Sequence, residues 1–183
     1  MYRVALRCAP ARLLCRSASS TASSVAVDVA GFARDGFGVV PGFASEEECD
    51  GMRARMAELI DGWDPEELVV FRTDSKQEET QGSSDYFLDS GDRIHFFLEP
   101  SAVDEATGGL SASVKKHEAL NKVGHGLHAA DEVFRAYSQS DKVAELTRAL
   151  GWVDPVLPQS MYIFKQANDG TEVTSHQVGA KYG

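Results

Sequence analysis

The chain has little of what a disulfide framework, a membrane span or a nucleic-acid-binding surface requires. Its three cysteines include Cys8 and Cys15 near the start, so Cys49 stands alone in the rest and builds neither a disulfide framework nor a zinc site. No apolar run approaches the roughly 20 residues that cross a bilayer. Acidic residues outnumber basic ones by 28 to 18, and a protein of this charge repels phosphate backbones. We therefore expect no membrane span and no nucleic-acid partner.

Carboxylates are also absent from residues 1–24, since the first one along the chain is Asp28. This segment holds four arginines and ends in a run of Ser, Thr and Ala, a composition typical of a mitochondrial or plastid transit peptide. A disordered basic tail is the alternative, and Pro10 argues against one continuous amphipathic helix. We expect import into an organelle, with residues 25–183 forming the domain.

The first half of that domain carries clear helix signals. Residues 25–36 predict a short helix ending at glycine, and residues 37–40 predict a short apolar strand. Ser45 and Glu48 form a capping-box pattern, so a second helix is predicted to begin there and to end at residues 61–62. Its apolar side chains recur at helical spacing and predict one buried stripe: Met52, Met56, Leu59 and Ile60.

The second half alternates loops, strands and helices. Residues 74–85 are polar and predict a loop, whereas residues 93–98 predict a strand with one buried face. Two glycines favour a loop over residues 121–128. Helices are predicted over residues 131–137 and 141–150, followed by a strand over residues 159–166. The order of elements indicates an α+β chain that leads into a β-domain.

Four segments together resemble the phytanoyl-CoA dioxygenase family, in particular its phytanoyl-CoA dioxygenase domain-containing branch. They are FARDGFGVVPGF (32–43), GSSDYFLDSGDRI (82–94), NKVGHGLHAAD (121–131) and QSMYIFKQ (159–166). The resemblance covers roughly residues 28–177. It implies the N-terminal helices and first strands of a double-stranded β-helix, or jelly roll, and an Fe(II)- and 2-oxoglutarate-dependent dioxygenase acting on a small molecule.

The resemblance also implies three site residues. His176 matches the first iron ligand of a site built from two histidines and a carboxylate. Lys122 and Met161 match positions that contact 2-oxoglutarate, as a cation for a carboxylate and as an apolar wall. Without the resemblance, Lys122 reads as a solvated lysine and Met161 as a core residue of a strand.

The same family pattern predicts that this chain lacks activity. Position 178, where the family has the metal-binding Asp, is Val, and a valine side chain cannot coordinate metal. The second histidine and the arginine for the far carboxylate belong downstream of residue 183 in the family. We therefore expect a truncated barrel with no catalytic residues and doubtful binding of Fe(II) and 2-oxoglutarate, from a frameshift, a retained intron or a misjoined exon.

Two other readings stay open. The chain could be a non-catalytic short form that acts as a binding module or self-associates through exposed strand edges. It could also be a structural α+β domain without a ligand, although the strand over residues 159–166 would then have no partner sheet. His125 and His128 could share a helical face and bind metal, but the glycines around them favour a loop.

Overall fold

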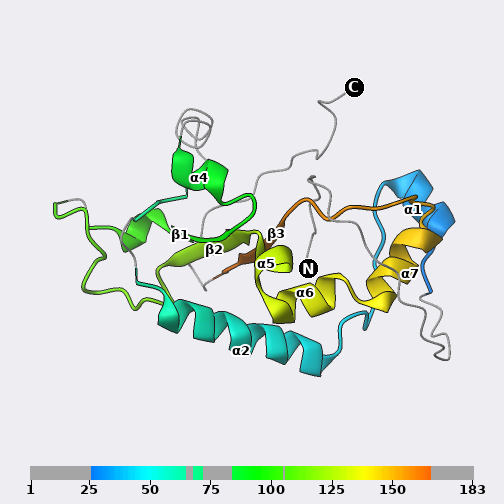
Figure 1. Ribbon diagram of the computed structural model, residues 1–183, viewed down its shortest axis with the longest axis horizontal. Coiled ribbons are helices and arrows are strands. Elements are labelled where there is room, and N and C mark those ends of the chain that lie inside the picture. Colours follow the sequence, from blue (N-terminus) through cyan, green and yellow to red (C-terminus); the bar gives the residue numbers. More distant parts are fainter. Residues whose placement is uncertain (1–25, 65–67, 72–83, 105, 166–183) are drawn as a thin grey trace.

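A three-stranded antiparallel sheet lies at the centre of the protein, in the order β1 (Ile94–Leu98), β2 (Leu120–His125), β3 (Ser160–Ile163). The structure is a computed structural model and describes residues 26–64, 68–71, 84–104 and 106–165. In Figure 1 the long helix α2 runs along one side of the sheet, and the short helix α4 lies on the other side. The arrangement is α+β, as predicted, while the jelly roll stays a prediction.

The two helices that precede the sheet begin and end at their capping residues. α1 (Val29–Asp35) starts where the Asp28 carboxylate accepts a hydrogen bond from the Gly31 amide, and it ends at Gly36 with a left-handed φ of 76°. α2 (Glu46–Gly62) starts with the predicted capping box, in which Ser45 and Glu48 each accept from the other's amide. Both predicted helices are confirmed.

Shorter helices connect the strands. They are α4 (Asp85–Asp89), the 3-10 turn η1 (Pro100–Ala102), α5 (Leu127–Ala130), α6 (Glu132–Ser138) and α7 (Asp141–Ala149). α6 and α7 confirm the helices predicted over residues 131–137 and 141–150. α4, capped by the hydroxyl of Ser84, is a helix that no sequence pattern indicated. None of the helices in the described ranges is long and apolar enough to cross a membrane.

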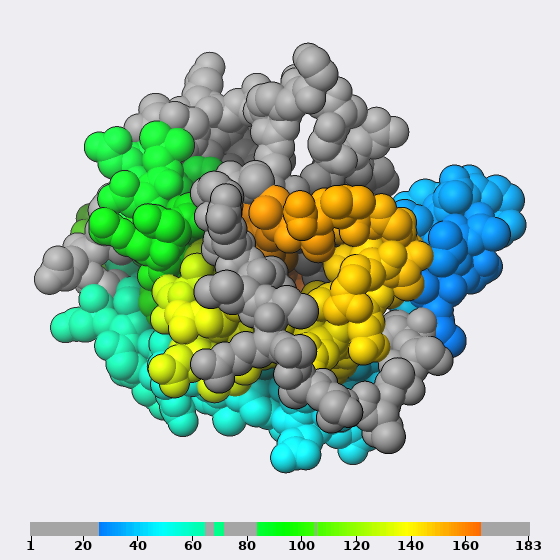
Figure 2. All heavy atoms as spheres, turned by 45° about the vertical axis from the view of Figure 1, so that its right-hand side comes forward, coloured from blue at the N-terminus to red at the C-terminus, as the bar shows by residue number. Residues whose placement is uncertain are grey.

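The strand predicted over residues 37–40 is wrong. These residues have no regular secondary structure, and Phe37 is 66% exposed. Figure 2 shows this part of the chain, in blue, standing out at one side of the molecule. A strand is stable only beside a hydrogen-bonding partner, and none of the described strands pairs with these residues.

The loop predicted over residues 121–128 is also wrong, because β2 is the central strand of the sheet and is buried along its whole length. It pairs with β1 on one side and with β3 on the other. Hydrogen bonds from two neighbours outweigh the weak strand preference of Gly124. β3 confirms the strand predicted over residues 159–166, and its pairing with β2 removes the objection that this strand would have no partner sheet.

One face of the sheet forms the hydrophobic core with α2. Phe96 and Leu98 of β1 and Val123 of β2 lie on this face and are buried. The predicted stripe of α2 packs against them, with Met56 and Ile60 fully buried and Met52 and Leu59 partly buried. The opposite face carries the side chains that are candidates for function.

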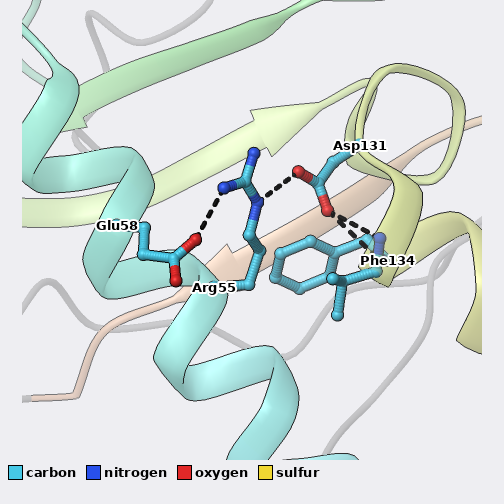
Figure 3. A network of polar contacts seen from close by, with 5 residues as sticks. Arg55, Glu58, Asp131 and Phe134 are labelled. Carbon is cyan, nitrogen blue, oxygen red and sulfur yellow. Dashed lines mark hydrogen bonds and ion pairs between the residues drawn. The ribbon is translucent and has the colours of Figure 1, made fainter.

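A buried carboxylate joins α2 to the start of α6. Asp131, whose side chain is 3% exposed, accepts a hydrogen bond from Arg55 Nε at 2.7 Å. Its other oxygen caps α6 by accepting from the backbone amides of Val133 and Phe134. Figure 3 shows Arg55 between Asp131 and Glu58, to which its Nη1 donates at 2.7 Å. This network fixes the angle at which α6 meets the long helix.

Candidate functional site

The strand register places the two predicted 2-oxoglutarate contacts on one face of the sheet. Lys122 on β2 lies opposite Phe97 on β1 and Ile163 on β3. Met161 on β3 lies opposite Gly124, two residues along from Lys122. Since residues two apart in a strand share a face, Lys122 and Met161 point to the same side and are diagonal neighbours on adjacent strands.

The Lys122 amine is buried among aromatic rings. The side chain is 6% exposed, and Nζ lies 3.6 Å from the centroid of the Phe71 ring. The rings of Phe97 and Phe87 lie 5.2 and 5.4 Å from the same atom. Phe71 is held there because its amide donates to the Leu98 carbonyl of β1. The three rings attract a cation but neutralise none of its charge.

No carboxylate among the described residues forms an ion pair with Lys122. Burial alone lowers the pKa of this amine from 10.5 to about 7. A buried charge is ordinarily paired, because an unpaired one is strongly destabilised. Lys122 therefore provides a hydrogen-bond donor and a positive charge that an anionic ligand could satisfy.

Gly124 makes room for the Met161 side chain. A Cβ at this position would lie 3.1 Å from the Met161 Cγ and 3.0 Å from the Ser160 carbonyl oxygen. The methionine side chain therefore lies against the bare backbone of β2, beside Lys122. This close approach explains a glycine in the middle of a buried strand.

We predict that Gly124→Ala destabilises the protein by about 1–2 kcal/mol, because the new methyl group overpacks the contact between β2 and β3. Gly51→Ala is the matched control, since Gly51 lies inside α2 and has nothing within 4 Å of a Cβ. That substitution should stabilise the protein by about 0.5–1 kcal/mol. Urea unfolding measures both changes, and a shift of the same sign in the two variants contradicts the packing assigned to Gly124.

His125 belongs to the same cluster, which the sequence did not indicate. The side chain is 5% exposed, and its ring lies 5.3 Å from the Phe87 ring and 5.5 Å from the Phe97 ring. Its Nδ1 is 2.7 Å from the hydroxyl of Ser90. Burial, then the charges of Lys122 and His95, lower its pKa to about 4, so the ring is neutral near pH 7. Since Ser90 lies 35 residues earlier, no local pattern connects the two.

The other described histidines have structural partners. His128 Nδ1 lies 2.9 Å from the Ser160 hydroxyl, which also accepts from the His128 amide. His95 bonds to the Tyr86 carbonyl and His117 to Asp61. Each of these contacts joins residues of different elements or loops. His128 therefore lies in a hydrogen-bonded link between α5 and β3.

Metal ligands do not gather in the described part of the chain. Within residues 26–64, 68–71, 84–104 and 106–165, no group of three or more His, Cys, Asp or Glu side chains could hold a metal ion. His176, the predicted iron ligand, and Val178 lie outside the described residues. The described residues thus fit an anionic ligand at Lys122 but do not by themselves make an iron site.

The chain is similar to known proteins over most of its length. The family model described as phytanoyl-CoA dioxygenase (PhyH) matches residues 32–180. The chain belongs to the phytanoyl-CoA dioxygenase family. It is 44% identical over 153 residues to phytanoyl-CoA dioxygenase domain-containing protein 1 of Danio rerio, covering 82% of this chain and 52% of that protein. To the phytanoyl-CoA dioxygenase of Arabidopsis thaliana it is 39% identical over 146 residues, covering 80% and 50%.

Membership of the phytanoyl-CoA dioxygenase family confirms the resemblance seen in the sequence. The family is generally dependent on Fe(II) and 2-oxoglutarate, and it suggests a dioxygenase-like function. The chain spans about half the length of the curated relatives it matches.

Proposed function

We propose that the sheet face around Lys122 and Met161 binds 2-oxoglutarate, and that the chain carries the cosubstrate-binding part of an Fe(II)- and 2-oxoglutarate-dependent dioxygenase. Lys122 would donate hydrogen bonds to one carboxylate of the ligand. Met161, lying flat over Gly124, would limit the space beside the ligand's carbon chain. The substrate would be a small molecule whose C–H bond is hydroxylated.

The observation that carries this proposal is the Lys122 amine, which is buried and forms no ion pair with any carboxylate among the described residues. A lysine whose only role was packing would be better replaced by an apolar side chain, because its pKa of about 7 reflects the free-energy cost of burying its charge. A ligand carboxylate would offset that cost by pairing with the ammonium group. The surrounding phenylalanines keep water away and strengthen the pairing.

His176 would be one of the iron ligands, and bound Fe(II) would activate O₂, the oxidant for hydroxylation, with 2-oxoglutarate as the co-reductant that loses CO₂. Val178 offers no donor atom at the position of the family's metal-binding Asp. We propose on this basis that the chain binds 2-oxoglutarate more readily than it turns it over. An assay of 2-oxoglutarate decarboxylation with added Fe(II) tests this, and turnover by this chain or by Val178→Asp alone would contradict it.

A non-catalytic short form that associates with a second copy is the alternative. Ile163 favours it, because this apolar side chain is exposed on β3, which pairs only with β2 among the described strands. Light scattering on the full chain distinguishes the two proposals. A monomer that binds 2-oxoglutarate supports the first proposal, and a dimer that does not bind 2-oxoglutarate supports the second.

The pH dependence of 2-oxoglutarate binding provides a specific prediction. Because only the ammonium form of Lys122 pairs with a carboxylate, binding raises its pKa and takes up a proton above pH 7. His125, the titratable side chain that faces the same rings, stays neutral because its pKa is about 4. His95, on β1, also lowers the pKa of His125. Given the Lys122 pKa of about 7, affinity should fall about twentyfold between pH 6.5 and pH 8.5.

Calorimetric titrations of the full chain with 2-oxoglutarate at the two pH values measure this change. Repeating them in buffers of different ionisation enthalpy counts the protons taken up. Lys122→Arg is the control, because a guanidinium stays charged throughout and should bind with nearly equal affinity at both pH values. Equal affinities for the wild-type chain at pH 6.5 and pH 8.5 would refute the role of Lys122.

A further inference from the structure

Phe71 reaches the sheet face of Lys122 from a short backbone ladder along the outer edge of β1. The Leu98 amide of β1 donates to the Val69 carbonyl at 2.8 Å, and the Phe71 amide donates to the Leu98 carbonyl at 2.9 Å. Val70, which pairs with Leu98 in parallel, packs against the core between the sheet and α2. Since successive side chains of an extended segment point to opposite faces, Phe71 lies on the other face, with Lys122.

Lys122 meets this ring by extending across the neighbouring strand. The lysine lies on β2 opposite Phe97 of β1, and residues 69–71 lie beyond β1. Its Nζ nevertheless lies over the ring of Phe71, 3.6 Å from the centroid. The Phe71 ring in turn rests edge-on against the Phe97 ring, with 6.4 Å between the centroids and 75° between the planes. Backbone hydrogen bonds and ring packing therefore hold a phenyl face at the end of the lysine side chain.

Phe71 is the nearest of the three rings around the amine. Nζ lies 5.2 Å from the Phe97 centroid and 5.4 Å from the Phe87 centroid, close to the limit of about 6 Å at which a ring attracts a cation. The face of a phenyl ring carries negative charge density, so it attracts an ammonium group much more strongly than a neutral amine. Burial has the opposite effect, because it favours the neutral amine. The Phe71 ring therefore favours the form of Lys122 that pairs with an anion.

We propose that Phe71 is the positioning residue for the Lys122 amine: its ring face keeps more of the lysine in the ammonium form and fixes Nζ on the sheet face where the cosubstrate binds. This inference rests on the proposed binding of 2-oxoglutarate at Lys122. The ring covers one side of the ammonium group, so the N–H groups on its other sides are left for a ligand carboxylate. A side chain needed only for packing could be replaced by leucine without changing the charge of the lysine.

Phe71→Leu removes the ring and keeps an apolar side chain, so it should lower the pKa of Lys122. Fewer chains then carry the ammonium form at alkaline pH. We expect Phe71→Leu to bind 2-oxoglutarate about fivefold more weakly than the wild-type chain at pH 8.5. At pH 5.5 the two affinities should be nearly equal, because the amine is charged in both proteins. Phe71→Tyr, which restores a ring, should recover the wild-type affinity. Calorimetric titration of the full chains measures these affinities.

Three other titratable side chains lie around these rings: His125 of β2, Tyr86 of α4 and His95 of β1. All three are the same in the wild-type chain and in the Phe71 variants. The difference between these proteins at one pH therefore isolates the charge of Lys122.

The titration of Lys122 without ligand is the second measurement, followed by ¹³C NMR of labelled lysine in the full chain. Trifluorophenylalanine at position 71 keeps the shape of the ring but withdraws charge from its face. It should lower the pKa of Lys122 as Phe71→Leu does, even if the leucine variant is unstable. Phe87→Leu is the distance control, since that ring lies 5.4 Å from Nζ, and it should lower the pKa of Lys122 less than Phe71→Leu.

The outcomes separate the two proposals. If the wild-type chain does not bind 2-oxoglutarate but Phe71→Leu and the fluorinated ring lower the pKa of Lys122, the proposed function fails and the role of Phe71 stands. If 2-oxoglutarate binds and the pKa of Lys122 is the same in all these proteins, the positioning role is overturned. An equal fall of the pKa in Phe87→Leu would overturn it as well. So would a loss of affinity in Phe71→Leu that is the same at pH 5.5 and pH 8.5, because the ring would then act by packing alone.

Discussion

Replacing Lys122 with Met is expected to weaken 2-oxoglutarate binding at least about thirtyfold and to make the fold more stable. The loss of affinity follows from removing the one buried cation of the described site, since a charged hydrogen bond to a ligand contributes about 2 kcal/mol or more. The gain in stability follows because a buried amine, which pairs with no carboxylate in the described part of the chain, is replaced by an apolar side chain of similar length. Such replacements stabilise proteins by about 1–4 kcal/mol.

The stabilisation by Lys122→Met should depend on pH in a defined direction. The pKa of Lys122 is lowered from 10.5 to about 7 by burial. Between these values the unfolded chain binds more protons than the folded one, so the wild-type protein becomes more stable as pH rises. The advantage of the variant should therefore be largest near pH 7 and should shrink toward pH 10.5.

Urea unfolding and calorimetric titration measure the two effects of Lys122→Met. Lys115→Met is the matched control, because the Lys115 side chain is exposed and pairs only with Glu118 on the surface. That variant should bind 2-oxoglutarate normally and unfold at nearly the same urea concentration. A Lys122→Met chain that is less stable than wild type would mean that the lysine is structural.

Asp131→Ala is expected to destabilise the protein by about 2 kcal/mol, mostly through loss of a helix cap. The substitution removes the N-cap of α6, typically about 1 kcal/mol, and leaves the Arg55 guanidinium without its buried partner. Although burial opposes ionisation of Asp131, the hydrogen bonds from Arg55 and from the α6 amides lower its pKa overall. The contribution of Asp131 to the free energy of unfolding should therefore be complete at neutral pH and should be lost as the pH falls through the lowered pKa of this carboxylate.

Two further variants test the origin of that loss. Asp131→Asn keeps an oxygen for the cap but loses the charge. Its free energy of unfolding should therefore lie between those of the wild type and Asp131→Ala. Asp50→Ala breaks an ion pair with Arg53 in which both side chains are largely exposed, and it should have no measurable effect on urea unfolding. Equal losses in the Asp50 and Asp131 variants would contradict the structural role of the buried pair.

Helices were predictable from the sequence where local chemistry decides their limits. Ser45 and Glu48 cap α2 through bonds within one turn, and Gly36 ends α1 through its own backbone conformation. β2 could not be predicted in this way, because Gly124 inside it and Gly126 just after it favour a loop until β1 and β3 pair with the strand. The strand prediction for residues 37–40 was wrong for the converse reason, because an apolar run forms a strand only where a partner strand pairs with it.

The candidate site shows the same division. The sequence pattern of Lys122 and Met161 is that of a surface lysine and a core methionine, and only the resemblance to the phytanoyl-CoA dioxygenase family gave them a role. The register adds what neither could show, which is that both lie on one face with Gly124 between them. The link between Ser90 and His125 depends on tertiary packing alone. His176 stays a prediction, since it lies outside the described residues.

Titration of the Lys122 amine in the full chain, followed by ¹³C NMR of labelled lysine and assigned with Lys122→Met, tests the central claim most directly. We expect a pKa of about 7 in the free protein, because the amine is buried, and a higher pKa when 2-oxoglutarate is added. A Lys122 amine that titrates near its ordinary value and does not respond to 2-oxoglutarate would contradict the account.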